Sequence, residues 1–247
     1  MRSDWNDIDV HDIDTVQRLP IGTVLKRGPR HFMYGSFAGT VTKGQGVQSS
    51  IPAAAHDALA PEATAVDSTS FEITSPASGS DDIEANEYAN GYAYLQVNGT
   101  PGYLYEIARN EAMDISATGN FLITLAPGNK LATALVVGDD IALIKHPAKD
   151  VVVMTTAGTG SFLGVSVENQ VANQFGWIGV KGPHPAASEG TLIIGEEART
   201  SEGTAGEFTP NDYSEATEAD RGSVGRVLDI GGDNEFSLIG FYGAGIL

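Results

Sequence analysis

The sequence has no cysteine, few basic residues and only short apolar runs. Without cysteine it can form no disulfide framework, zinc–thiolate site or cysteine nucleophile. Its 14 Lys and Arg stand against 32 Asp and Glu, and the formal charge of −18 argues against nucleic acid as a partner. The apolar run Leu131–Val137 is far shorter than the roughly 20 residues of a membrane span, and the N-terminal residues have no apolar signal core. We therefore expect a soluble protein that binds neither nucleic acid nor membrane.

Glycine and proline are what the sequence has in abundance. Its 30 Gly and 11 Pro interrupt almost every stretch that is long enough for a helix. The helix-like run Ala53–Ala60 is stopped by Pro61 and is equally compatible with an Ala-rich linker. Elsewhere, short runs rich in Val, Ile, Phe and Tyr are bounded by Gly, Pro, Asn or Asp. This pattern predicts an all-β fold.

The sequence divides into regions that differ in composition. Residues 1–18 alternate aspartates with apolar residues such as Trp5, Ile8 and Val10, which predicts an extended N-terminal arm that is mobile in the free protein and becomes ordered on a partner. Residues 196–220 are acidic and poor in large apolar side chains, so we expect a long solvated loop there. We predict a β-barrel or β-tulip-like domain from residues 19–52 plus 149–247, a linker at 53–65 and an inserted β domain at 66–148.

The clearest local signal is a hairpin. Tyr92–Val97 and Tyr103–Ile107 flank an Asn-Gly-Thr-Pro-Gly turn, and the Asn-Gly pair readily adopts positive φ. Four tyrosines alternate with smaller residues on the two strands and are predicted to share one face. Cross-strand aromatic packing and a sugar-stacking surface are the two interpretations of that face. Further strands are predicted at Ser70–Thr74, Phe121–Leu125, Ala134–Val137, Ile141–Ile144 and Val151–Met154.

Common catalytic motifs are missing from the sequence. It contains no Walker A pattern, no G-x-S-x-G elbow and no H-E-x-x-H. A triad assembled from distant residues stays open, because its members need only be close in space. On balance the sequence predicts a protein that is not an enzyme. The five histidines lie far apart in the sequence, and none has a partner at i+2, i+3 or i+4; they are His11, His31, His56, His146 and His184.

Acidic clusters raise the question of a metal. Asp7–Asp14 and Asp229–Glu235 could offer oxygen ligands, but neither matches the twelve-residue spacing of an EF-hand loop. Solvated turns explain both clusters, so we predict no cofactor and keep a structural Ca²⁺ as the alternative.

Basic residues concentrate in one place, at Lys26, Arg27, Arg30 and His31. The surrounding sequence resembles a hairpin tip. It is either a solvated tip or a contact for an acidic neighbour, such as the acidic loop of another copy. With the apolar residues of the arm it supplies our candidate partner-contact residues, which are Trp5, Ile8, Val10, Lys26, Arg27 and Arg30.

Five stretches, in their order along the chain, resemble virion structural proteins of tailed bacteriophages, especially those of marine bacteria. They are Leu19–Leu25, Phe37–Val47, Asn90–Val97 with Gly102–Ile107, Gly176–Pro183 and Val224–Leu228. The resemblance spans roughly residues 19–247. The acidic arm and the acidic insertion at 196–220 depart from it.

The resemblance points to capsid decoration or cement proteins, in which a small β-barrel or β-tulip on the outside of the head clamps neighbouring capsid subunits. It implies the major capsid protein as partner, a homo-oligomer, a location on the outer surface of the capsid, and no catalytic residues. The alternatives are a tail, collar or fibre component of the virion and a glycan-binding adhesin that uses the tyrosine hairpin.

Overall fold

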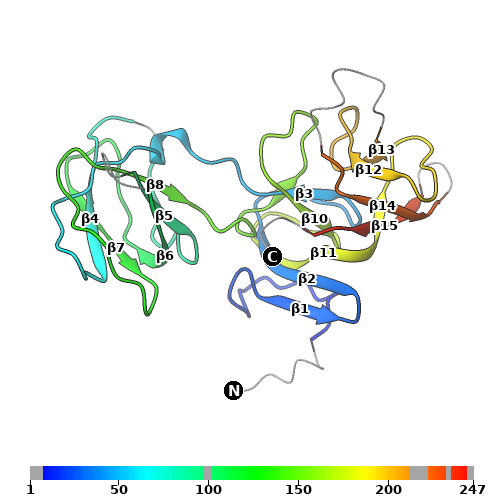
Figure 1. Cartoon of the computed structure of the whole chain (residues 1–247), viewed down its shortest axis with the longest axis horizontal. Helices are drawn as coiled ribbons and strands as arrows, with labels where there is room; N and C mark the ends of the chain where they lie inside the picture. The colour runs from blue at the N-terminus through cyan, green and yellow to red at the C-terminus, as the bar shows by residue number, and fades with distance from the viewer. Residues whose placement is uncertain (1–7, 80, 97–101, 212–221, 232–234, 244–247) are drawn as a thin grey trace. The chain divides into compact units, whose positions relative to one another are not determined.

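The computed structural model describes residues 8–79, 81–96, 102–211, 222–231 and 235–243. The described residues form β-strands and one short 3₁₀ turn, Ala54–His56, in place of the helix-like run. The predicted all-β fold is confirmed. The chain divides into unit 1, residues 1–51 and 147–247, and unit 2, residues 52–146 (Figure 1).

Unit 1 is built on a ten-stranded sheet. Its strands are β1 (Val24–Arg27), β2 (Arg30–Phe37), β3 (Gly46–Gln48), β9 (Val152–Val153), β10 (Phe162–Ser166), β11 (Gln174–Ala187), β12 (Glu197–Thr200), β13 (Phe208–Pro210), β14 (Gly225–Asp229) and β15 (Phe236–Phe241). The order is β13-β12-β14-β15-β11-β10-β3-β9, and β2 pairs with both β1 and β11. The hairpin predicted around the basic residues is present, with Gly28 and Pro29 between β1 and β2.

The long strand β11 connects two parts of this sheet. Its first half pairs with β2 and β10, whereas its second half pairs with β15. The register shifts between Gly179 and Lys181, and Gly182 has a φ of +83°. A side chain at Gly182 would overlap the carbonyl of Pro29, so the bend requires glycine. The first part of the sheet curls into a half-barrel (Figure 1).

The core of unit 1 lies in two clusters, one on each side of this bend. In the first, the Trp177 ring meets the Tyr34 ring edge-on, with their centroids 5.4 Å apart. In the second, Phe208 and Phe241 make a similar contact at 5.4 Å. Trp177 is therefore a core residue rather than an exposed contact for a partner.

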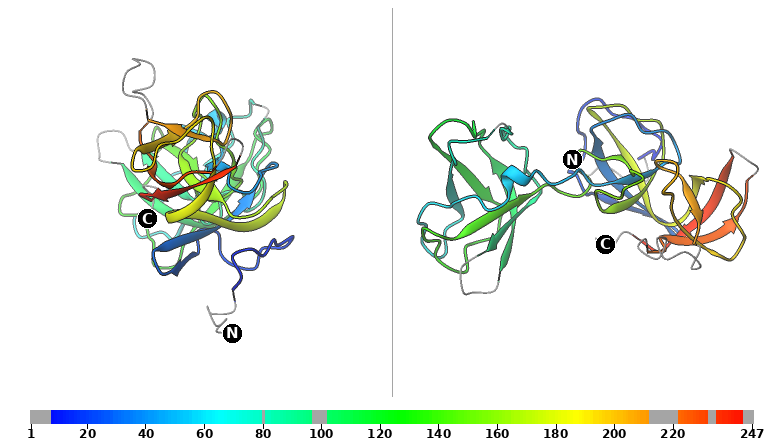
Figure 2. Two further views of the ribbon diagram at one scale, coloured as in Figure 1. Left: turned by 90° about the vertical axis from the view of Figure 1, so that its right-hand side faces the viewer. Right: turned by 90° about the horizontal axis from the view of Figure 1, so that it is seen from above.

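Unit 2 has one five-stranded antiparallel sheet in the order β4-β7-β6-β5-β8. The strands are β4 (Ser70–Thr74), β5 (Tyr92–Gln96), β6 (Tyr103–Asn110), β7 (Asn120–Leu125) and β8 (Asp140–Ile144). They surround a separate hydrophobic core (Figure 2). The expected strand Ala134–Val137 is wrong, because this stretch makes only isolated bridges, such as that of Leu135 to Thr64.

The four tyrosines of the β5–β6 hairpin do not share a face, contrary to the prediction. Tyr105 lies opposite Ala93 on the buried side of the sheet, while Tyr94 lies opposite Leu104 on the outer side. The hairpin register pairs even-numbered positions of β5 with even-numbered positions of β6. Because strand side chains alternate, tyrosines at even positions of one strand and odd positions of the other must point to opposite sides.

The expected linker at 53–65 is part of unit 2. Leu59 is 3% exposed and forms a bridge to Ile141, and Pro61 forms one to Ile73. These residues cover the two edge strands of the sheet. The linker interpretation is wrong because Leu59 belongs to the hydrophobic core of unit 2.

The described part of the expected arm, residues 8–18, is packed on unit 1. Val10 is 4% exposed within the core, and Asp14 exchanges backbone hydrogen bonds with Phe175. The Tyr34 hydroxyl donates to Asp14 Oδ2 at 3.0 Å, and Arg18 Nε lies 2.7 Å from Oδ1. The free-arm prediction fails for residues 8–14, because Ile8 and Val10 pack against the core and the buried Asp14 carboxylate is paired, although Ile13 and Val16 are exposed.

The expected acidic loop at 196–220 begins as sheet. Strands β12 and β13 pair with each other and bury Ala198 and Phe208. The solvated-loop prediction is therefore wrong up to Pro210, because these small and aromatic side chains complete the second core cluster. Residues 212–221 lie outside the described part of the chain.

Candidate functional site

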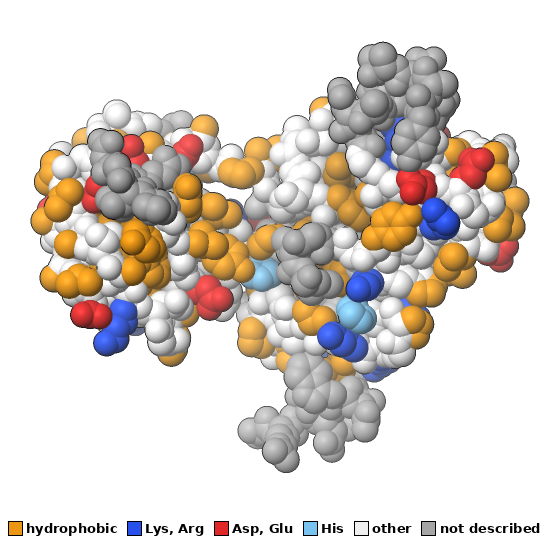
Figure 3. All heavy atoms as spheres, in the orientation of Figure 1, with side chains coloured by type: hydrophobic (Ala, Val, Ile, Leu, Met, Phe, Trp, Pro, Cys, Tyr) orange, Lys and Arg blue, Asp and Glu red, His pale blue; other side chains and the backbone are white. Residues whose placement is uncertain are grey.

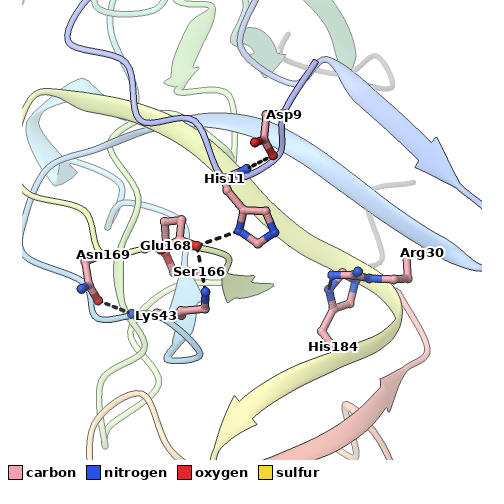
Figure 4. Close-up of polar contacts among 8 residues, drawn as sticks. All are labelled: Asp9, His11, Arg30, Lys43, Ser166, Glu168, Asn169 and His184. Atoms are coloured by element: carbon pink, nitrogen blue, oxygen red, sulfur yellow. Dashed lines mark hydrogen bonds and ion pairs between the residues drawn. The ribbon is translucent and has the colours of Figure 1, made fainter. Parts of the chain in front are cut away.

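Unit 1 carries a cavity of about 410 Å³, which we call the basic groove. Its polar lining comes from His11, Arg30, Lys43, Ser166 and His184. Its apolar lining comes from Val165, Val167, Pro183, Pro185 and Leu238. Figure 4 shows that the polar side chains reach the groove from separate segments of the chain. A mostly apolar hollow with a few polar groups is the usual form of a ligand site.

Arg30 is the cation at one end of the groove. Its guanidinium carbon lies 4.7 Å from the centroid of the Phe32 ring, a cation–π contact that holds the group in place. Nη2 lies 3.4 Å from His184 Nδ1, and Nε is buried without an acceptor among the described residues. Burial lowers the pKa of Arg30, and the nearby Arg27 lowers it further. The guanidinium is therefore a partly desolvated charge that no described carboxylate pairs.

His184 is 1% exposed, and its buried ring lies against the Arg30 guanidinium. Its Nε2 lies 3.0 Å from the carbonyl of Lys181 and must donate to it, which leaves Nδ1 as the acceptor facing Arg30. Burial lowers the pKa of His184 to about 4, against hydrogen bonds to backbone carbonyls that raise it. The ring is therefore neutral at pH 7.

The other end of the groove has a carboxylate-centred cluster. Glu168 Oε1 lies 2.6 Å from His11 Nδ1 and 2.8 Å from Lys43 Nζ (Figure 4). Hydrogen bonds from Lys43 and His11 lower the pKa of Glu168. The backbone N–H of Lys43 donates to Asn169 Oδ1 at 2.8 Å. The cluster ties the N-terminal segment to two loops of unit 1, and both Lys43 and His11 already have Glu168 as a partner.

The groove brings a serine near histidines but does not align them for nucleophilic catalysis. Ser166 Oγ donates to the backbone carbonyl of Glu168 at 2.6 Å, not to His11 or His184. A serine nucleophile needs a hydrogen bond to its base. Ser166 is therefore not hydrogen-bonded to a histidine base in this structure.

The basic hairpin tip divides its residues between two faces, because strand side chains alternate. Arg27 lies opposite Arg30 on the groove side, and its guanidinium donates to the carbonyl of Ile8. On the other side, Lys26 and Lys181 lie across the strands from His31, and we call these three the basic row. Figure 3 shows basic side chains beside a histidine on this unit, amid hydrophobic and uncharged surface.

The candidate contact residues therefore have different places in the structure. Arg30 lines the groove, Arg27 holds the N-terminal segment, and Lys26 belongs to the basic row. Ile8 is partly buried against the core, and Val10 lies within it, so Val10 offers no surface to a partner. Trp5 lies outside the described residues.

Sequence reasoning missed three groups that shape the groove: Lys43, Glu168 and His184. Glu168 is 157 residues from His11 along the chain, and no local motif links them. His184 meets Arg30 because β2 pairs with the first half of β11 and the strand then bends. The contact of His184 with Arg30 follows from that strand pairing, whereas the contact of Glu168 with His11 follows from the docking of the N-terminal segment.

Within the described ranges, no group of three or more His, Cys, Asp or Glu side chains is placed to hold a metal ion. Asp7 and residues 232–234 of the two acidic stretches lie outside those ranges. No helix in the described part of the chain is long and apolar enough to cross a membrane.

Comparison with protein-family models, with curated proteins and with solved structures found no match to this chain.

Proposed function

We propose that this chain is a structural virion protein that decorates and stabilises the head of a tailed bacteriophage by binding capsid subunits. The sequence stretches that resemble phage virion proteins support the proposal, as does the organisation into two β units with separate cores. Its partner would be the major capsid protein, and its place the outer surface of the capsid, where it acts as an oligomer. It would carry out no catalysis.

The observation that carries the proposal is the concentration of basic side chains on unit 1. In a chain with a formal charge of −18, general repulsion keeps copies soluble before assembly. The basic row and the groove then offer local positive surfaces to an acidic partner. Complementary charge of this kind sets the orientation and rate of docking more than its final affinity.

The test is to mix purified protein with phage heads that lack it and to measure sedimentation with the heads and their survival of heating. We expect binding and a higher temperature of head rupture. Lys26→Glu with Lys181→Glu should weaken binding, whereas Arg109→Glu, an exposed charge change on β6 of unit 2, should not. Heads that neither bind the protein nor gain heat resistance would contradict the proposal.

A glycan-binding adhesin is the second candidate, and one observation favours it. Tyr94 is 37% exposed on the outer side of the unit 2 sheet, opposite the exposed Leu104. An exposed aromatic ring beside apolar surface can stack on a sugar. A glycan array that gives a specific signal, lost in Tyr94→Ala, together with unchanged heat resistance of phage heads, would favour this function over decoration.

A further inference from the structure

We propose that the basic groove of unit 1 binds an extended, acidic and apolar segment of a partner protein, with one carboxylate of that segment placed on Arg30. The inference deepens the proposed function by naming the chemistry of the bound segment. The identity of the partner as a capsid subunit rests on that function, but the chemistry of the groove does not.

Arg30 is the residue that would bind the carboxylate of the partner segment. Phe32 and His184 hold the guanidinium in place, and Nε has no acceptor among the described residues. The planar guanidinium offers paired donors that match a carboxylate. Because His184 is neutral, its Nδ1 can accept a hydrogen bond from the guanidinium, whereas a protonated ring would repel it.

The charges around Arg30 leave it as the binding cation. Lys43 and His11 both contact Glu168, so that carboxylate is neutralised within its own cluster. Arg27 is on the same side of the hairpin as Arg30 and adds positive potential. A ligand carboxylate therefore meets net positive charge at this end of the groove.

The shape of the surface favours a chain segment over a small ion. A second hollow of about 200 Å³, lined in part by Phe236 and Glu207, shares Lys43 with the basic groove. Leu238 and Phe236 point to the same side of β15, about 7 Å apart along the strand. They form an apolar track from one hollow to the next, together with Pro185 opposite Leu238. An acetate or phosphate ion would leave this track uncovered.

The far hollow sets the direction of the segment. It is lined by Glu207 and Glu235, and burial followed by the nearby Glu189 raises the pKa of Glu207. Carboxylates there repel a second acidic residue. The segment that fits best has an acidic residue at Arg30, apolar residues on the track and a neutral or basic residue beyond them.

Calorimetric titration of the full chain with a capped pentapeptide tests the inference. The peptide has one glutamate, three apolar residues and one lysine, and its control has glutamine in place of the glutamate. We expect the glutamate peptide to bind at least roughly tenfold more tightly than the control, because a charge-assisted hydrogen bond is lost. Equal binding of the two peptides, or no binding of either, would overturn the proposal.

Variants of the full chain locate the site. Arg30→Gln should weaken binding at least roughly tenfold, and Arg30→Lys should weaken it less, since it keeps the charge but loses the paired donors. Leu238→Ala tests the apolar track without touching Arg30 and should weaken binding several-fold. Arg109→Gln is the matched control and should leave binding unchanged. Circular dichroism and thermal unfolding check that each variant is folded.

Other occupants of the groove would give different results. If sodium acetate or inorganic phosphate binds as tightly as the peptide, the groove is a small-anion site and the proposal fails. If Arg30→Gln dissociates an oligomer in sedimentation and no peptide binds, the occupant is a second copy of this chain, which also overturns it. Peptide binding that persists while phage heads are not bound would support the groove chemistry and contradict only the proposed function.

Discussion

At the scale of single residues, His184 shows how burial assigns a role that residue type alone does not. It is enclosed by the Phe32 ring, which meets it edge-on at 5.1 Å, and by Arg30. Water cannot solvate a proton added to this ring, and Arg30 repels it. The histidine therefore serves as a neutral acceptor that positions Arg30.

This burial predicts a dependence of stability on pH. The folded pKa of His184 is about 4, below the roughly 6.5 of an unfolded histidine. The unfolded chain therefore binds more protons between these values, so the stabilisation is complete above pH 6.5 and is lost as the pH falls toward 4. We expect His184 to account for about 3 kcal/mol of that loss. Urea unfolding of wild type and His184→Gln at pH 7 and pH 4 measures it. A variant with the pH dependence of the wild type would contradict the assignment.

At the scale of elements, the N-terminal segment is the most informative, because its structure differs from the expected free arm. Residues 8–14 lie along the half-barrel through Val10, Asp14 and the bond from Arg27 to Ile8. His11 also completes the groove. The segment is therefore structural for unit 1 and for its candidate site.

Asp14 provides the test of this docking. Asp14→Ala leaves the buried Tyr34 hydroxyl without its acceptor, and we expect the free energy of unfolding to fall by about 2 kcal/mol. In the Asp14→Ala background, Tyr34→Phe should cost little more, because it removes the hydroxyl whose proton has lost its acceptor and gives up only the 3.3 Å hydrogen bond from the Arg18 N–H. Asp12→Ala, an exposed neighbour, is the matched control. Chemical unfolding of wild type, Asp14→Ala, Tyr34→Phe and the double variant measures the coupling, and purely additive effects would show that the segment is not docked through this pair.

The β5–β6 hairpin was predicted correctly in its strand pairing but not in the placement of its tyrosines. The sequence correctly predicted that the two tyrosine-containing strands pair, while the predicted Asn-Gly turn lies outside the described residues. The prediction of one aromatic face was wrong because the face depends on the register of the two strands, in which Tyr105 lies opposite Ala93 and both are buried in the core.

At the scale of the whole molecule, the two units have separate hydrophobic cores. Unit 2 is one continuous stretch, residues 52–146, and unit 1 is formed from the chain before and after it. Unit 2 closes its own edges, through the bridges of Leu59 to β8 and of Pro61 to β4. Each unit therefore has what a domain needs to fold alone.

We expect residues 52–146, expressed alone, to fold cooperatively with the same β-sheet signal that they have in the full chain. Deleting them and joining residues 51 and 147 by a short Gly-Ser linker should leave unit 1 folded. Circular dichroism and dispersed amide resonances in NMR spectra measure both outcomes. An isolated unit 2 that is unfolded would show that its core depends on the rest of the chain.

The sequence by itself determined the all-β class, most strand positions and the hairpin tip at Gly28 and Pro29. These features depend on turn residues and on the two-residue alternation of strands, which act over a few positions. Arg30 was among the predicted contact residues for the same reason, because a hairpin tip is a local feature.

Only the tertiary structure decided which side chains meet. Each of three outcomes depends on a partner more than 80 residues away. Residues 53–65 pack because Leu59 meets Ile141, and Val10 is buried in a core that Phe175 packs against. Arg30 faces the groove beside His184. Such contacts are fixed by strand register and by the bend in β11, through the burial of whole faces of the sheet. No short stretch of sequence contains that information, because the energy that selects it comes from packing across the unit.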